Sequence, residues 1–261
     1  MTTASLLHPP SGQSLRPEIV PLVSGRDLTR AWGRGTSATL GLDRVDIDLV
    51  AGSLVAIVGP SGSGKSTLGA LLAGIDRPTS GSLVIDGDRI DAMSDDRLAR
   101  WRAEHVGIVF QDFHLLPTLT AQENVELAVR FADRRAGRSE RRDRARAALA
   151  AVGLGGHRRR LPAQMSGGEQ QRVAIARAIV TDPALVVADE PTGSLDQATG
   201  AQVFEQLVGL RDRGATVVFI THDPALADRC DEVIEMLDGR VAAQRSNVSA
   251  PSVETATAVA R

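Results

Sequence analysis

The sequence predicts an α/β fold, in which an antiparallel β subdomain precedes a mostly parallel sheet and an α-helical subdomain is inserted into that sheet. Short apolar runs typical of buried parallel strands occur at Leu54–Val58, Val106–Phe110, Leu185–Ala188 and Val217–Ile220. Between the second and the third of these runs, from Thr120 to about Val180, helical periodicity dominates and no strand is predicted. The helical stretch therefore interrupts the sheet along the chain.

Length and composition agree with one such domain. The chain has 261 residues, of which 43% are hydrophobic, and this is enough for a core of ordinary size. We expect the domain at residues 25–243 with the helical insertion at about 112–182. Loosely ordered or disordered tails are expected at 1–24, tightening into a strand near Ile19–Val23, and at 244–261.

Composition also limits the cellular context. No stretch approaches the roughly 18 apolar residues that span a bilayer, and the N-terminal residues lack a signal-peptide pattern. We therefore expect any work at a membrane to need a partner. The single cysteine, Cys230, excludes an internal disulfide and agrees with a reducing cytoplasm. The net charge of −2 offers no general attraction to nucleic acid.

Several shorter patterns fill in the first half of the domain. Val45–Leu49 alternates polar and apolar residues, as a half-exposed antiparallel strand does. A helix is predicted at about Ser66–Ala73, and a strand with its turn at Leu83–Gly87. Ser94 is a candidate N-cap for a short helix that ends near Glu104.

The second half contains helices with clear apolar stripes and a hairpin. Within Ser139–Val152 the predicted buried residues are spaced i, i+3, i+4 and i+7: Ala145, Ala148, Leu149 and Val152. A helix after residue 191 is predicted to bury Val203, Phe204, Leu207 and Val208. Asp238-Gly239 between Val233–Leu237 and Arg240–Ala242 predicts a hairpin.

The chemistry begins with GPSGSGKST, which fits the phosphate-binding pattern G-x-x-x-x-G-K-[ST]. Glycines let successive backbone N–H groups turn inward around phosphates, Lys65 places a cation on the β- and γ-phosphates, and the Ser66 hydroxyl suits Mg²⁺. The predicted strand before the loop and helix after it disfavour a chance Gly/Ser-rich turn. A P-loop NTPase core that binds a nucleoside triphosphate is predicted, with these binding residues: Gly59, Pro60, Ser61, Gly62, Ser63, Gly64, Lys65, Ser66 and Thr67.

Two adjacent carboxylates follow the apolar run at 185–188. At the end of a strand beside the P-loop, Asp189 can hold Mg²⁺ and Glu190 can polarise an attacking water. Neighbouring side chains on a strand point in different directions, so one residue cannot do both jobs. Taken alone, the pair is also compatible with an acidic turn.

Three further features follow predicted strands or open a helix. In Met165–Arg172 (MSGGEQQR) two glycines open a helix, which offers a second backbone-amide site for phosphate or an ordinary helix start. Gln111 ends a strand before the irregular apolar segment Phe113–Leu119. His222 ends another strand and can donate to a γ-phosphate, although a lone histidine is more often structural.

Taken together and in this order, these residues make the chain resemble the nucleotide-binding subunit of ATP-binding-cassette (ABC) transporters across about residues 26–243. The resemblance rests on the P-loop at 59–67, the Q-loop residue Gln111, the signature SGGEQ at 166–170, Walker B at 185–190, the D-loop Ser194-Leu195-Asp196 and the switch residue His222. It implies the ABC ATPase fold, with Glu190, His222 and Gln111 as catalytic residues. It also implies Ser66, Gln111 and Asp189 as Mg²⁺ ligands.

The sequence departs from the family pattern at two positions and follows its subfamily at a third. The signature opens with Met165 where Leu is usual, a swap of similar volume. Its fifth residue is Glu169 rather than Gln, which the resembled subfamily commonly shows. The chain has no Tyr to stack on adenine, and Trp32 falls where that aromatic residue should be. A structural role for this Trp is the alternative.

In the family, two such domains pack head-to-tail around two ATP molecules, so the resemblance implies that the signature contacts the ATP of the other subunit. The predicted contacting residues are Ser166, Gly167, Gly168 and Glu169. The segments at 110–128 and 165–179 look most like the ATPases of macrolide-export, lipoprotein-release and cell-division-associated systems. Their permeases carry a large extracytoplasmic domain. We therefore expect a peripheral protein at the cytoplasmic face of the membrane, bound to a permease that grips the helical insertion.

Two questions stay open at this level. Residues 134–160 contain ten arginines against Glu140 and Asp143; a solvated helix face is the simpler interpretation, and a nucleic-acid or anionic-lipid surface the alternative. No nucleic-acid partner is expected, because no aromatic residue alternates with these arginines. The motor could also transmit a signal and transport nothing. A P-loop phosphotransferase, or a DNA-repair or translation ABC protein, fits less well.

Overall fold

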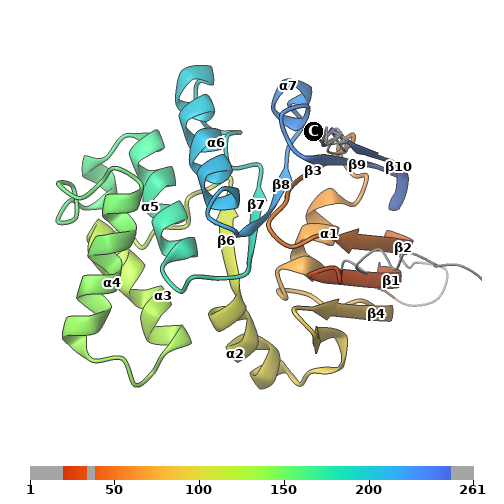
Figure 1. Cartoon of the computed structure of the whole chain (residues 1–261), viewed down its shortest axis with the longest axis horizontal. Coiled ribbons are helices and arrows are strands. Elements are labelled where there is room, and N and C mark those ends of the chain that lie inside the picture. Colours follow the sequence, from red (N-terminus) through yellow and green to blue (C-terminus); the bar gives the residue numbers. More distant parts are fainter. Residues whose placement is uncertain (1–19, 34–38, 248–261) are drawn as a thin grey trace, which may run out of the picture.

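Two sheets and a group of helices make up residues 20–33 and 39–247, the part of the chain that the computed structural model describes (Figure 1). The strands are β1 (Val23–Trp32), β2 (Thr39–Leu49), β3 (Leu54–Val58), β4 (Ser80–Ile85), β5 (Asp88–Arg89), β6 (Val106–Phe110), β7 (Leu185–Asp189), β8 (Thr216–Ile220), β9 (Glu232–Leu237) and β10 (Arg240–Ser246). The helices are α1 (Lys65–Leu72), α2 (Asp95–His105), α3 (Ala121–Ala132), α4 (Arg138–Ala151), α5 (Gly167–Ile179), α6 (Gln197–Arg211) and α7 (Pro224–Ala227), with 3₁₀ turns η2 (Ile90–Ala92) and η3 (Pro162–Gln164).

The larger sheet has the strand order β10-β9-β3-β8-β7-β6 and is parallel except for β10, which pairs antiparallel with β9. The four apolar runs form β3, β8, β7 and the edge strand β6 of this sheet, as predicted, because parallel strands are buried on both faces. Ile57 of β3 lies level with Ile220 of β8, and Ile220 lies level with Asp189 of β7. The carboxyl ends of these strands therefore meet at one edge, where the loops that follow them converge.

The smaller sheet is antiparallel, with the order β2-β1-β4-β5. Its alternating residues face a core cluster that also includes Leu68, Leu71 and Leu72 of α1 and residues of β3, β7 and β8. Helix α1 is thus packed between the two sheets (Figure 1). This arrangement confirms the predicted antiparallel β subdomain and fixes the helix that follows the P-loop from both sides.

Helices α3, α4 and α5 lie between β6 and β7 along the chain and stand together on one side of the molecule (Figure 1). The predicted stripe of α4 packs inward, since Ala145 and Leu149 are fully buried against the same cluster as Val173 of α5. A capping box between Thr120 and Glu123 begins α3. None of the described helices combines the length and the apolar character that a membrane crossing requires.

The structure differs from the expectation at both ends of the domain. The first strand begins at Val23 and runs to Trp32, whereas a strand near Ile19–Val23 was expected; Ile19 and the rest of residues 1–19 lie outside the described part. At the other end β10 continues to Ser246, so the expected tail at 244–246 is instead a strand. The reason is pairing with β9, where Gln244 lies opposite Ile234. The remaining expected tail, 248–261, lies outside the described residues.

Candidate functional site

The P-loop joins the end of β3 to the start of α1 and is shaped by close backbone contacts. Gly59 has φ 149°, and a Cβ there would lie 2.2 Å from the carbonyl oxygen of Met236 in β9. Gly64 has φ 99°, and a Cβ there would lie 2.5 Å from the carbonyl oxygen of Gly41. Because a side chain fits at neither position, the close approach of the neighbouring backbone requires glycine at both.

The side chain of Lys65 is folded into this loop. Its ammonium group donates hydrogen bonds of 2.9 Å to the carbonyl oxygens of Gly59 and Pro60, and the residue is 7% exposed. A buried cation surrounded by inward backbone groups suits a phosphate chain, which would satisfy the charge more fully than two carbonyl dipoles. The nearby Ser63 hydroxyl is buried and has no partner among the described residues, so it too is free to donate.

A hydroxyl and a carboxylate meet beside the loop. Ser66 Oγ, at the start of α1, lies 3.4 Å from Oδ1 of Asp189 at the end of β7, and donates to it. Burial raises the pKa of Asp189, and the hydrogen bond from Ser66 opposes that rise. Two hard oxygens that face each other next to a phosphate site fit Mg²⁺ as ligands. The described residues contain no cluster of three or more His, Cys, Asp or Glu side chains that could hold a metal.

Glu190 directly follows Asp189, the last residue of β7. Its backbone has φ 45°, and its N–H donates to the carbonyl oxygen of Ile220, which ties the residue to β8. Its Oε2 lies 3.4 Å from Nδ1 of His222, the second residue after β8. The strained backbone thus turns Glu190 toward His222, and the two neighbouring carboxylates take separate directions as predicted.

Trp32, at the end of β1, completes one wall of the site. A cavity of about 540 Å³ is lined by the P-loop, Trp32, Glu190, His222 and the segment Thr39–Gly41 of β2. The indole is 41% exposed, and the guanidinium carbon of Arg30 lies 5.2 Å from its ring centre. An exposed aromatic face beside a phosphate cradle suits a nucleotide base. Sequence reasoning missed Thr39–Gly41, because only the pairing of β1 with β2 brings them here.

Gln111 does not line this cavity. It follows β6, which is separated from β3 by β7 and β8 in the sheet. Its side chain packs against the D-loop region, since a Cβ at Gly193 would lie 3.0 Å from Gln111 Nε2. Ser194 Oγ lies 3.5 Å from the Gln111 carbonyl oxygen. A role for Gln111 in Mg²⁺ binding or catalysis stays a prediction.

The signature also lies outside the cavity, at the start of α5. Ser166 is the N-cap, and its side chain accepts from the backbone N–H of Glu169. A Cβ at Gly167 would lie 3.3 Å from Leu195, and one at Gly168 would lie 2.3 Å from the Cγ2 atom of Thr199. The beginning of α5 is therefore packed tightly against the D-loop and the start of α6.

Glu169 is occupied within its own chain. Its carboxylate accepts from the backbone N–H of Ser166 and so completes a capping box. It also lies 2.8 Å from Nδ1 of His157 and 3.6 Å from Nη1 of Arg160. The capping bond, followed by these charges, holds the pKa of Glu169 below its usual range. These contacts explain how the carboxylate is held; contact of Glu169 with a nucleotide stays a prediction.

Comparison with known proteins shows which family the chain is similar to. A family model described as "ABC transporter" matches residues 42–193. The chain is 42% identical over 230 residues to the probable syringafactin export ATP-binding/permease protein SyfD of Pseudomonas syringae pv. syringae, covering 88% of this chain and 35% of that protein. It is 43% identical over 222 residues to the macrolide export ATP-binding/permease protein MacB of Escherichia coli, covering 85% and 34%.

A solved structure extends the similarity to the whole fold. The ATP-binding cassette MJ0796, in a dimeric post-hydrolysis state bound to ADP and Pi, is 39% identical with a TM-score of 0.80, and the match covers 87% of this chain and 99% of that one. The chain spans about a third of the length of the curated relatives it matches. The match therefore spans nearly the whole MJ0796 chain but only one part of the export proteins.

Proposed function

The chain belongs to the ABC transporter family, and we propose that it is the ATP-hydrolysing motor of such a transporter, pairing around two ATP molecules to drive a membrane permease. One observation carries this proposal. A buried lysine, a serine–aspartate pair and a glutamate–histidine pair line one end of the parallel sheet, around a cavity walled by an exposed indole. Each group suits one part of a nucleoside triphosphate or of its hydrolysis.

Each residue then has a separate task. Bound ATP would supply the phosphoanhydride bond that is hydrolysed, and Mg²⁺ would offset the negative charge of the phosphates. Lys65 binds the β- and γ-phosphate oxygens, while Ser66 and Asp189 hold the ion. Glu190 accepts a proton at its Oε1 atom from the water that attacks the γ-phosphorus, as the bond to the β–γ bridging oxygen breaks and ADP and phosphate form. His222 orients Glu190 through Nδ1, and its imidazole can also donate to a γ-phosphate.

A second copy of the chain would complete the site. The signature residues Ser166–Gly168 lie outside the cavity of their own chain, so their backbone donors at the start of α5 are available to another nucleotide. The dimeric form of MJ0796 with ADP and Pi supports a pair of cassettes. The family resemblance implies that the pair is head-to-tail, with each signature facing the partner's P-loop. ATP is then part of the interface, and its hydrolysis loosens the dimer.

A groove on the helical side offers a docking place for the permease. A cavity of about 340 Å³ lies between α2, β6 and α3, with a mostly apolar lining that includes Leu116, Leu127 and Phe131. Phe131 is 67% exposed, and Arg102 and Arg177 line the same cavity. An amphipathic cytoplasmic helix that presents an acidic residue to these arginines fits this mixture of surfaces. The protein would then lie at the cytoplasmic face of the membrane.

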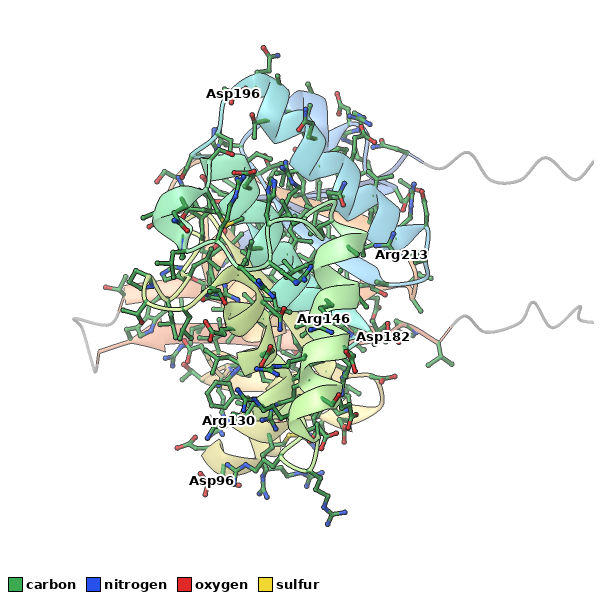
Figure 2. All side chains as sticks on the ribbon, turned by 90° about the vertical axis from the view of Figure 1, so that its left-hand side faces the viewer. Asp96, Arg130, Arg146, Asp182, Asp196 and Arg213 are labelled. Atoms are coloured by element: carbon green, nitrogen blue, oxygen red, sulfur yellow. The ribbon has the colours of Figure 1, made fainter. Side chains whose placement is uncertain are left out.

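The arginine-rich segment 134–160 behaves mainly as a solvated face of the helical group. Figure 2 looks onto this side, with Arg146 on α4 at its centre. Arg146 pairs with Asp143, and Arg144 donates to the carbonyl oxygen of Val180. These local bonds favour a structural role, and we expect no nucleic-acid partner.

Export is the proposed direction of transport. The relatives SyfD and MacB are named as export ATP-binding/permease proteins, which supports an exporter or extractor. The resemblance of residues 110–128 and 165–179 to one subfamily implies a permease with a large extracytoplasmic domain. A motor that transmits a signal and transports nothing is the second candidate. The same catalytic residues serve both, so the permease decides between them.

The partner can be identified with a trapped motor. Tagged Glu190→Gln protein is incubated with native membranes and Mg-ATP, and co-purifying proteins are identified by mass spectrometry. We expect a permease with a large extracytoplasmic domain, and we expect its loss in a matched Lys65→Ala, Glu190→Gln control that cannot bind ATP. Recovery of only soluble protein or nucleic acid would overturn the transporter assignment.

A further inference from the structure

Gln171 lies one turn into α5 and is fully buried, with 0% of its surface exposed. Its side-chain Nε2 donates two hydrogen bonds, one of 3.1 Å to the carbonyl oxygen of Phe110 and one of 2.7 Å to that of Pro191. Both N–H groups of the amide are therefore used. A buried amide that makes two bonds to distant backbone groups is strongly constrained in position.

The two carbonyl groups belong to the ends of neighbouring strands. Phe110 is the last residue of β6 and precedes Gln111, whereas Pro191 follows Glu190. In the sheet Phe110 lies opposite Asp189. One side chain therefore bridges the strand end that leads to the Q-loop and the strand end that carries the catalytic carboxylate.

The orientation of this amide is unambiguous. The other side-chain atom, Oε1, has no hydrogen-bond partner among the described residues. Rotating the amide by half a turn would place that oxygen against two carbonyl oxygens and lose both bonds. The bridge works only with a donor group that can reach both carbonyls, which among side chains of this length Gln provides.

The same helix begins with the signature. Ser166 caps α5, and Gly168 is packed so closely against α6 that a Cβ would lie 2.3 Å from Thr199 Cγ2. Because the start of α5 is tightly packed against α6, a displacement of this helix end moves the helix instead of being taken up by a gap. It is transmitted along the first turns of the helix to Gln171, and through its two bonds to Phe110 and Pro191.

We propose that Gln171 is a positioning residue that couples the signature helix to Gln111 and Glu190, so that engagement of one subunit's signature by the partner's ATP sets the catalytic carboxylate of its own site. This rests on the proposed dimeric ATPase function. Gln171 does not line the nucleotide cavity, and it acts through its bonds to the backbone at the two strand ends. Its loss reduces turnover and the cooperativity between the two ATP sites without weakening ATP binding to the single subunit.

The test measures ATP turnover against ATP concentration for Gln171→Met, which keeps the length and removes both donors. We expect kcat to fall at least tenfold, on the order of the loss that a misplacement of about 1 Å causes, and the Hill coefficient to fall toward 1. Nucleotide affinity of the subunit, followed by Trp32 fluorescence, stays unchanged. The matched control is Gln202→Met, because Gln202 is exposed on α6 and belongs to neither the signature nor the lining of the nucleotide cavity.

A second variant distinguishes a positioning effect from a loss of folding in Gln171→Met. Gln171→Glu keeps the shape, and its buried carboxyl is protonated more readily than a free one, so it retains one donor. We expect intermediate kcat and Hill coefficient, with recovery toward the wild-type values as pH falls. Unchanged kcat and Hill coefficient in either folded variant, or losses equal to those of Gln202→Met, would overturn the proposal. Absence of ATP hydrolysis in the wild-type protein would instead overturn the proposed function.

Discussion

The indole of Trp32 lies directly over Gly41, since a Cβ built at Gly41 would come within 2.4 Å of Cζ3 of the ring. The two residues belong to the paired strands β1 and β2, and Gly41 also faces the P-loop, where the same Cβ would lie 3.2 Å from Thr67 Oγ1. The missing side chain at residue 41 therefore leaves the space in which the aromatic wall of the cavity sits.

This contact predicts the effect of filling that space. Gly41→Val displaces the indole and raises the KM for ATP by about tenfold, since loss of a base-stacking contact costs roughly 1–3 kcal/mol. Nucleotide-dependent quenching of Trp32 fluorescence, recorded in a Trp101→Phe background, decreases in parallel. Gly137→Ala is the control, because nothing lies within 4 Å of a Cβ there. An unchanged KM would argue against base stacking on Trp32.

We expect Lys65 to be required for tight ATP binding. Lys65→Ala removes the buried cation and weakens ATP binding at least tenfold, because a charge-assisted bond to phosphate is lost. Arg26→Ala, which breaks an exposed ion pair with Asp48 on the antiparallel sheet, is the charge-matched control and leaves binding unchanged. Isothermal titration calorimetry measures both. Equal affinity in the Lys65 variant would contradict the phosphate role of the loop.

Glu190 should decide turnover. Glu190→Gln keeps ATP bound and slows phosphate release by about 10²-fold or more, the usual contribution of a general base. The variant then accumulates as a dimer in Mg-ATP, as size-exclusion chromatography detects. His222→Ala, which removes the contact at Nδ1, also lowers kcat while KM changes little. Phosphate release near the wild-type rate in Glu190→Gln would exclude this residue as the base.

Glu169 should make the start of α5 sensitive to acid. Its pKa is lower in the folded protein than its ordinary value of 4.5, so the ionised carboxylate stabilises the fold above that pH and the contribution is lost as pH falls through the folded pKa. Glu169→Ala costs about 1 kcal/mol of unfolding free energy at pH 7, the value of a helix cap, and progressively less as pH falls below 4.5 through the folded pKa. Urea unfolding over a series of pH values from 7 downward measures the difference. A pH-independent loss would mean that the charge plays no part.

Cys230 should be inert in the folded protein. Burial raises the pKa of its thiol to about 12, and the residue is 2% exposed. We expect iodoacetamide at pH 8 to label it only after urea is added, with intact mass spectrometry as the measurement and glutathione as the reactivity reference. Labelling of the native protein at the rate of glutathione would show that the β9 side of the domain opens readily.

The local motifs were predictable because their conformations depend on neighbouring residues. The glycine spacing of residues 59–64 defines a loop that backbone sterics permit few other sequences to form. Apolar runs identified four strands of the larger sheet. The residue after a run, such as Asp189, lies at the edge where the carboxyl ends of the strands meet. Ser166 and Glu169 three positions apart are likewise a local helix start.

Other features depend on pairs of segments that are far apart in the chain. The sequence by itself determined the phosphate loop, its lysine, the carboxylates at the strand end and the helical insertion. Each of these features depends on a short local pattern of residue types. Only the tertiary structure decided that Gly41 makes room for Trp32 and that Gln171 bridges Phe110 and Pro191. It also decided that Gln244–Ser246 joins β9. Strand pairing and buried hydrogen bonds create these contacts. Nothing in a single sequence indicates that the residues on the two sides of each contact will meet, because they are far apart in the chain.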